Sequence, residues 1–252
     1  MPDNVKSILF AAVMAIICSA ILTGVSSGLK DFRLENIALD KKKHILKVVG
    51  LLDPQNEPPR ETIAALYHQN IREVRVDKNG RIVTPAGEGT VHLPVYYRIE
   101  NDRIGAYIIP VSSRGLWGKI YGYMALDKDG TTITGFTVYQ HSETPGLGGE
   151  IEKAWFQKNF KGKKIVDRAG DFASIVIAKG KVKKNLPKDR RLNYVDGISG
   201  ATLTGKYLTL GIRETLNTYE PISIKFRKNL ILNPKTDREQ TPKPLVPDNT
   251  ES

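Results

Sequence analysis

The sequence predicts an α+β fold, in which a domain rich in antiparallel β-sheet with packed helices follows one N-terminal transmembrane helix. Three observations predict this fold. The run from Ser7 to Leu29 contains no charged residue, and a bilayer core requires ~20 apolar residues. A middle stretch alternates short β-type runs with turn residues. A later run repeats apolar residues at helical spacing.

Composition limits the kinds of partner. The 252 residues carry a formal net charge of +11, but the basic residues are scattered without a recognition helix or aromatic-basic platform. We therefore expect no nucleic-acid partner, because an anionic membrane surface or acidic partner subunits account for the charge equally well. The single cysteine, Cys18, excludes a disulfide within the chain, and the four dispersed histidines predict no metal site.

The N-terminal segment predicts an uncleaved membrane anchor over residues 1–30, followed by a polar stalk over 31–59. Two alternatives, a cleaved signal peptide and a lipoprotein signal, are weaker. Ser26–Gly28 is a poor cleavage site, and Ile17 stands where a lipoprotein signal requires a small residue before Cys18. The positive charges concentrate after the span, which by itself predicts that the following domain stays in the cytoplasm.

The domain is predicted to begin with a helix over 60–71, because its apolar residues fall on one face. Strands over 73–76 and 81–83 flank the turn Lys78–Gly80. Further strands are predicted at 91–99, 104–111, 119–127 and 131–139.

The second half is predicted to begin with a Gly-rich loop over 141–150, which leads into a helix reaching Phe160. A strand over 173–178 follows. After the long helix near the C-terminus, Pro221 predicts a break and a short strand over 222–226. The tail over 229–252 is predicted to be disordered, because it is polar and becomes rich in proline.

The stretch Asp196–Gly205 sets small residues and hydroxyls at the start of a helix whose apolar stripe is Leu208, Ile212, Leu216 and Tyr219. A helix start offers unpaired N–H groups and a positive dipole end, which suit a phosphate. Gly200 and Ala201 would let an anion approach the backbone, and Ser199, Thr202 and Thr204 offer oxygens. The alternative is an ordinary helix capped by Ser199.

The sequence Asp-Gly-Ile-Ser-Gly-Ala-Thr-Leu-Thr, which begins at Asp196, resembles the flavinylation motif of FMN-binding domains in membrane redox complexes. The resemblance implies that Thr202 carries FMN through a phosphoester bond. The other cofactor-binding residues expected around the phosphate are Ser199, Gly200, Ala201 and Thr204.

Glu-Thr-Pro-Gly-Leu-Gly, beginning at Glu143, is similar to the second motif of that family. The resemblance implies that Glu143, Thr144 and Leu147 lie along the isoalloxazine ring. Trp117 lies in a Gly-Leu-Trp-Gly sequence and is either a core residue beside a turn or, as the resemblance implies, a neighbour of the flavin ring. Lys179 is either a cation that complements the flavin or a solvated lysine in a turn.

The order of anchor, stalk and motifs resembles the family of C subunits of Na⁺-translocating NADH:quinone reductases, with the G subunits of Rnf complexes as near relatives. The resemblance implies an FMN-binding domain over 60–228, covalent FMN, and an electron carrier without catalytic residues or a substrate site of its own. It also implies maturation by a flavin transferase, other reductase subunits as partners, and a single-pass protein of the inner membrane. The resemblance also implies that the domain faces the periplasm, whereas the positive charges after the span predict that it stays in the cytoplasm.

Three other functions are considered. The chain could be the FMN-binding subunit of an Rnf-type or other extracytoplasmic electron-transfer complex. A hydrolase could use Ser199 with His141 or Asp196, but the sequence contains no nucleophile elbow or ordered triad. A membrane-anchored basic domain that binds anionic polymers would explain the charge but neither glycine-rich motif.

Overall fold

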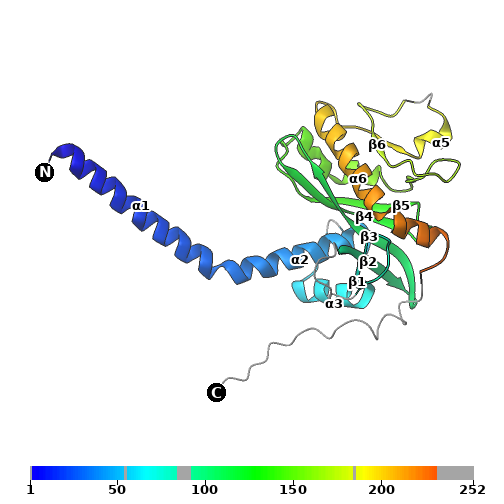
Figure 1. Ribbon diagram of the computed structural model, residues 1–252, viewed down its shortest axis with the longest axis horizontal. Coiled ribbons are helices and arrows are strands. Elements are labelled where there is room, and N and C mark those ends of the chain that lie inside the picture. Colours follow the sequence, from blue (N-terminus) through cyan, green and yellow to red (C-terminus); the bar gives the residue numbers. More distant parts are fainter. Residues whose placement is uncertain (1, 54–55, 84–91, 184–185, 232–252) are drawn as a thin grey trace, which may run out of the picture. The chain divides into compact units, whose positions relative to one another are not determined.

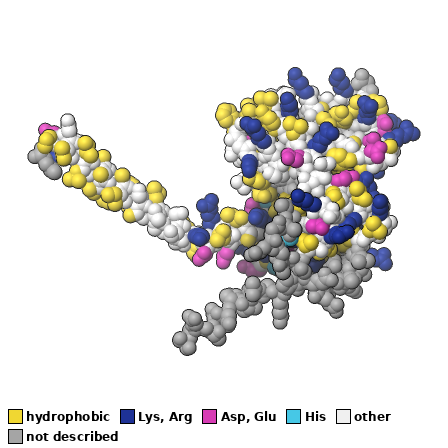
Figure 2. Space-filling view, in the orientation of Figure 1, with side chains coloured by type: hydrophobic (Ala, Val, Ile, Leu, Met, Phe, Trp, Pro, Cys, Tyr) yellow, Lys and Arg dark blue, Asp and Glu magenta, His cyan; other side chains and the backbone are white. Residues whose placement is uncertain are grey.

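The computed structural model describes residues 2–53, 56–83, 92–183 and 186–231 (Figure 1). The chain divides into two compact units, Met1–Lys42 and Lys43–Ser252. The first unit contains helix α1 (Asp3–Gly28) and the beginning of α2 (Lys30–Val48). Within this unit α1 buries no residue, and its length and apolar composition suffice to cross a membrane. Figure 2 shows hydrophobic side chains along α1 and charged side chains where α2 begins.

The second unit is built on a five-stranded antiparallel sheet in the order β1-β2-β3-β4-β5. Each strand pairs with its neighbour in the sequence, so the sheet is a meander. This result confirms the antiparallel sheet that the alternating pattern predicts. The strands are β1 (Ile71–Val76), β2 (Leu93–Glu100), β3 (Arg103–Arg114), β4 (Lys119–Asp127) and β5 (Ile133–Gln140).

Helix α6 (Thr202–Arg227) packs against β3 on one face of the sheet (Figure 1). Its predicted apolar stripe is buried, from Leu208 to Tyr219. Gly211 lies so close to Ser113 of β3 that a Cβ there would overlap the serine side chain. This close approach lets α6 lie directly against β3.

The opposite face of the sheet is covered by α3 (Arg60–Asn70), which packs on β1 and β2, and by the C-terminal end of α2, which contacts β5. Ile45 and Leu46 of α2 are buried, and Arg98 of β2 donates a hydrogen bond of 2.9 Å to the Val49 carbonyl. Arg98 projects to this face because neighbouring Tyr97 belongs to the core under α6, and successive side chains alternate. The sheet is therefore covered on both faces.

The connection from β5 to α6 is mostly irregular and carries short elements. The helix expected to reach Phe160 is divided into a 3₁₀ helix, η1 (Gly148–Glu152), and α4 (Ala154–Lys158). The strand expected over 173–178 is wrong in length, because Ser174 has φ +62° and only β6 (Val176–Ile177) is extended. β6 pairs in parallel with β7 (Tyr194–Val195), which follows the short α5 (Lys188–Arg191).

The strand predicted after Pro221 is wrong, because α6 continues through Pro221 to Arg227. Proline at this position removes one backbone donor, but the following turn is held by tertiary contacts. Phe226 stacks on Tyr107 with ring centroids 4.3 Å apart, and Ser223 Oγ donates to the Gly130 carbonyl at 2.8 Å. Packing against the sheet thus outweighs the local preference.

The predicted hairpin is present only in part. Ile82 makes a single bridge to Val76, and the main partner of β1 is β2. Residue 91 of the predicted strand 91–99 lies outside the described residues, as does the predicted tail from residue 232 onward.

Replacing Gly211 with alanine should lower the free energy of unfolding. In an exposed helix this change gains about 1 kcal/mol, but here the added methyl group overlaps Ser113 and costs about 1–3 kcal/mol. Denaturant unfolding of the full chain in detergent measures the difference. Arg213→Ala, at an exposed position of the same helix, is the control. A Gly211→Ala protein as stable as the unaltered chain would contradict the close packing.

Candidate functional site

A pocket of about 330 Å³ lies where three segments meet at the beginning of α6. The segments are the β3–β4 hairpin, the loop after β5, and the first turn of α6. They bring together most of the predicted cofactor-binding residues, which lie far apart in the sequence. The lining residues are Leu116, Trp117, Glu143, Thr144, Leu147, Gly148, Gly200, Ala201, Thr202, Leu203 and Thr204.

Glu143 joins the three segments. Its side chain is buried, with 4% of the residue exposed. Oε1 accepts hydrogen bonds from the backbone N–H groups of Leu116 at 2.8 Å and Trp117 at 3.0 Å. Oε2 accepts a hydrogen bond of 2.5 Å from Thr204 Oγ1. A buried carboxylate is costly unless its oxygens are hydrogen-bonded, so these contacts explain how Glu143 is tolerated there.

Gly148 makes room for this arrangement. A Cβ at residue 148 would lie 2.6 Å from both Glu143 Oε2 and Thr204 Oγ1, so any other residue there would push these two side chains out of their contact. Sequence reasoning did not assign a role to Gly148, although its place in the Gly-Leu-Gly-Gly run was a visible indication. Leu116 and Leu203 also line the pocket without having been predicted.

The two threonines of the motif have different environments. Thr202 is exposed and lines the pocket, whereas Thr204 is 2% exposed and its hydroxyl is bonded to Glu143. The Thr202 hydroxyl makes no hydrogen bond to any residue that the structure describes. Thr202 therefore offers the accessible hydroxyl of the pair.

The beginning of α6 has no side-chain cap. Ala201 occupies the cap position, so the alternative in which Ser199 caps the helix is wrong. Among the described residues, no acceptor is recorded for the backbone N–H groups of residues 202–204. Gly200 precedes them with φ +75°, a conformation that favours glycine. An uncapped start with three available donors is suited to an anion.

The mouth of the pocket is apolar. Trp117 is 69% exposed, so the alternative of a core tryptophan is wrong. Leu116, Leu147 and Leu203 are also exposed at the same pocket. Exposed large apolar side chains beside a few polar groups are typical of a binding site for a small organic molecule.

Two predicted residues, Ser199 and Lys179, do not line the pocket. Lys179 is exposed in the turn after β6. The next residue, Gly180, accepts a backbone hydrogen bond of 2.7 Å from Gly197, which places this turn beside the beginning of the motif. Ser199 stands one residue before the lining residue Gly200.

The residues considered for a hydrolase are engaged elsewhere. His141 Nδ1 accepts a hydrogen bond from the Glu143 N–H at 3.1 Å, and Nε2 lies 3.2 Å from Glu152 Oε2. A hydrogen bond from Lys153, with a further one from His141, lowers the pKa of Glu152. Asp196 Oδ1 accepts from the Val182 N–H at 2.7 Å. Neither His141 nor Asp196 is hydrogen-bonded to Ser199 in the described structure, so no nucleophile–base pair is assembled.

Comparisons with known proteins agree with this geometry. A family model described as an FMN-binding domain matches residues 115–217. The C subunit of the Na⁺-translocating NADH-quinone reductase from Yersinia pestis is 31% identical over 240 residues, covering 84% of this chain and 86% of the relative. The protein of the same name from Pseudomonas aeruginosa is 31% identical over 234 residues, covering 81% and 88%.

Solved structures give the same result. The crystal structure of the C subunit from Parabacteroides distasonis matches with a TM-score of 0.65 and 31% identity, over 77% of this chain and 96% of that one. The crystal structure of the Shewanella oneidensis protein named NqrC has a TM-score of 0.61 at 21% identity, over 75% and 97%, and supports the fold alone.

Replacing Glu143 with alanine should lower the free energy of unfolding by about 2–4 kcal/mol, because it leaves the buried Thr204 hydroxyl and two part-buried backbone N–H groups without their acceptor. Glu143→Gln should cost less, because the amide oxygen still accepts from the hairpin. Denaturant unfolding measures both effects, and hydrogen exchange should quicken at Leu116 and Trp117. The control is Glu61→Ala at an exposed position of α3. Equal effects of Glu143→Ala and Glu61→Ala would refute the role of Glu143.

Proposed function

Because this chain belongs to the family of C subunits of Na⁺-translocating NADH-quinone reductases, we propose that it is an electron-transfer subunit of such a complex. We further propose that it carries FMN as a covalent cofactor, esterified through the FMN phosphate to the hydroxyl of Thr202. The FMN-binding domain model matched over residues 115–217 supports the cofactor.

One observation carries the choice of Thr202. Its side chain is exposed at the pocket, whereas the hydroxyl of Thr204 is buried and donates to Glu143. A flavin transferase must reach the oxygen that becomes esterified, and a buried, hydrogen-bonded hydroxyl cannot be reached without opening the site. The proposal therefore assigns the covalent bond to Thr202 and a supporting role to Thr204.

The residues around Thr202 suit a phosphate. The N–H groups at the start of α6 would donate to its oxygens, and the helix dipole would favour its negative charge. Gly200 and Ala201 have little or no side chain to keep the phosphate away from the backbone. We propose that Ser199 contributes to the same end of the flavin and that Lys179 complements its charge from the neighbouring turn.

The apolar mouth suits the isoalloxazine ring. Trp117 and Leu147 are exposed on the pocket and would pack on the ring. Glu143 and Thr144 form part of the lining, and the Glu143 carboxylate holds the hairpin that carries Trp117. The described residues therefore suit both parts of FMN. The N–H groups at the helix start suit the phosphate, and the apolar mouth suits the ring.

When bound, FMN supplies the electron transfer, and the chain contributes position and environment. A covalent bond at the phosphate would keep the cofactor from being lost and limit how far its ring can move. We propose no acid or base for the reaction among the described residues. The binding sites for NADH and quinone are proposed to lie on other subunits of the complex.

The proposal places the chain in the cell inner membrane, anchored by α1. The FMN-binding domain is proposed to include residues 60–228 and to begin earlier than the sequence predicts, at Lys43, where the second compact unit begins. The connecting stalk is then shorter than the predicted 31–59 and ends at Lys42. The domain is proposed to face the periplasm, where a flavin transferase would act on it. The basic residues after the span do not oppose this orientation strongly, because large domains translocate largely regardless of charge.

Thr202→Val should fold and lack covalent flavin, because it removes the hydroxyl while keeping the side-chain shape. The matched variant Thr204→Val should retain covalent flavin and unfold more easily, because it loses the bond to Glu143. In-gel flavin fluorescence and intact mass should be measured after expression together with the flavin transferase. Peptide mapping then locates the adduct.

An adduct that persists in Thr202→Val, or that maps to Ser199 or Thr204, would show that the assignment is incorrect. Expression without the transferase is not a test of Thr202, because the unaltered chain would then also lack the covalent bond.

The proposed orientation is tested by cysteine labelling in whole cells. The natural Cys18 lies in α1, within the proposed span, and should resist a membrane-impermeant maleimide. Arg168→Cys, at an exposed position of the domain, should be labelled from the periplasmic side, and Lys6→Cys should be labelled only after lysis. The reverse pattern would place the domain in the cytoplasm.

A further inference from the structure

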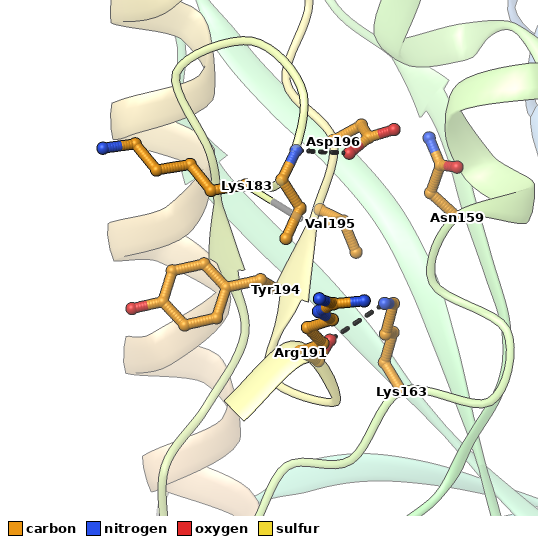
Figure 3. A pocket seen from close by; sticks show the side chains of 8 residues that line it. Asn159, Lys163, Lys183, Arg191, Tyr194, Val195 and Asp196 are labelled. Carbon is orange, nitrogen blue, oxygen red and sulfur yellow. Dashed lines mark hydrogen bonds between the residues drawn. The ribbon is translucent and has the colours of Figure 1, made fainter. Parts of the chain in front are cut away.

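A second cavity, of about 240 Å³, lies beside β7 and shares no lining residue with the flavin pocket (Figure 3). It is formed by the segment after α4, the segment after β6, and the chain from α5 to the beginning of the motif. Its lining residues are Asn159, Lys163, Val182, Lys183, Arg191, Tyr194, Val195 and Asp196.

One side of the cavity carries two cations, Lys163 and Arg191 (Figure 3). Lys163 Nζ donates to the Arg191 carbonyl at 3.0 Å, and Arg191 Nε donates to the Leu186 carbonyl at 2.7 Å. These bonds fix both side chains and leave further donors on the ammonium and the guanidinium. In the described ranges of the chain, neither cation has a carboxylate within salt-bridge distance. Burial lowers the pKa of Lys163, and the charge of Asp196 opposes this shift.

The other side carries Asn159 and Asp196, while the side chains of Lys183 and Tyr194 point away from this group (Figure 3). Asp196 Oδ1 accepts a hydrogen bond from the Val182 N–H at 2.7 Å. For Oδ2 no partner is recorded among the residues that the structure describes. A carboxylate oxygen accepts hydrogen bonds, so a ligand that contacts Oδ2 would have to donate one.

This combination restricts the ligand. Two cations attract an oxyanion, and Arg in particular pairs with phosphate oxygens. A carboxylate on the same cavity repels an anion unless the anion brings a proton to it. Inorganic phosphate retains a proton on one oxygen at neutral pH, whereas sulfate does not.

We propose that this cavity binds inorganic phosphate as hydrogen phosphate, whose P–OH group donates to Asp196 while its other oxygens accept from Lys163 and Arg191. Asn159 supplies a further amide beside Asp196. Bound phosphate would connect the segment after α4 with β7, the strand that leads into the motif. The proposal does not depend on the flavin assignment, because the two sites have separate linings.

The test measures binding of phosphate to the full-length protein in detergent at pH 8 and constant ionic strength, by isothermal titration calorimetry. Sulfate and methyl phosphate, neither of which carries a hydroxyl group at this pH, are the comparison ligands. A phosphomonoester has a second pKa near 6, so at pH 8 it lacks the P–OH group. Phosphate should bind at least about tenfold more tightly than either. Equal affinity for the three anions, or no binding of phosphate, would overturn the proposal.

Variants identify the residues responsible. Asp196→Asn should remove the preference for phosphate over sulfate, because an amide can donate to an anion that carries no proton. Arg191→Gln and Lys163→Met should each weaken the binding of phosphate about tenfold or more. Arg168→Ala removes an exposed cation outside the cavity and should leave binding unchanged.

Circular dichroism melting shows which variants fold, and two cation variants are used so that the loss of one does not end the test. Phosphate affinity unchanged in a folded Arg191→Gln or Lys163→Met protein would refute the proposal. A preference for phosphate retained in Asp196→Asn would refute the role of the carboxylate.

Discussion

The site depends on the burial of one carboxylate. Glu143 is ionisable and almost fully enclosed, so its oxygens must be met by donors, and those donors come from two other segments. The backbone of the β3–β4 hairpin supplies two N–H groups, and α6 supplies the Thr204 hydroxyl. Satisfying this residue therefore fixes the relative positions of three segments that are separated in the sequence. The pocket is the space left on the solvent side of this junction.

The meander sheet makes the junction possible. β3 and β4 extend beyond the other pairings and end in the hairpin that carries Trp117, while α6 packs along β3 with its first turn near that hairpin. The contact between Gly211 and Ser113 holds the helix close to the sheet, two to three turns after Thr202. A flavin site at the beginning of α6 requires that the helix keep its position. The packing of α6 on β3, which lies outside the pocket, contributes to that position.

Local patterns in the sequence were sufficient to predict three features. Periodicity predicts the sheet and the buried stripe of α6, and a long uncharged apolar run predicts the helix α1. Local patterns failed where tertiary contacts decide the outcome. Pro221 lies inside α6 because Phe226 and Ser223 pack on the β-sheet domain, and the strand near Ser174 is shortened by a single positive φ angle. In the pocket, most of the lining residues come from the predicted motifs, but Ser199 and Lys179 do not line it, and the motifs do not tell the different roles of the residues apart. The sequence does not reveal that Glu143 bonds to a hairpin 26 residues earlier, because that contact exists only after the sheet has formed.

The difference in exposure between Thr202 and Thr204 follows from helix geometry. Two residues along a helix correspond to a rotation of about 200°, so neighbours at this spacing point to nearly opposite sides. When Thr204 turns inward to meet Glu143, Thr202 must turn outward to the pocket. A motif that spaced its hydroxyls three or four residues apart would place both on the same face, where both could be buried or both exposed. The spacing Thr-Leu-Thr thus couples the anchoring of the helix to the exposure of one oxygen, and the carboxylate that orders the site also selects which threonine remains accessible.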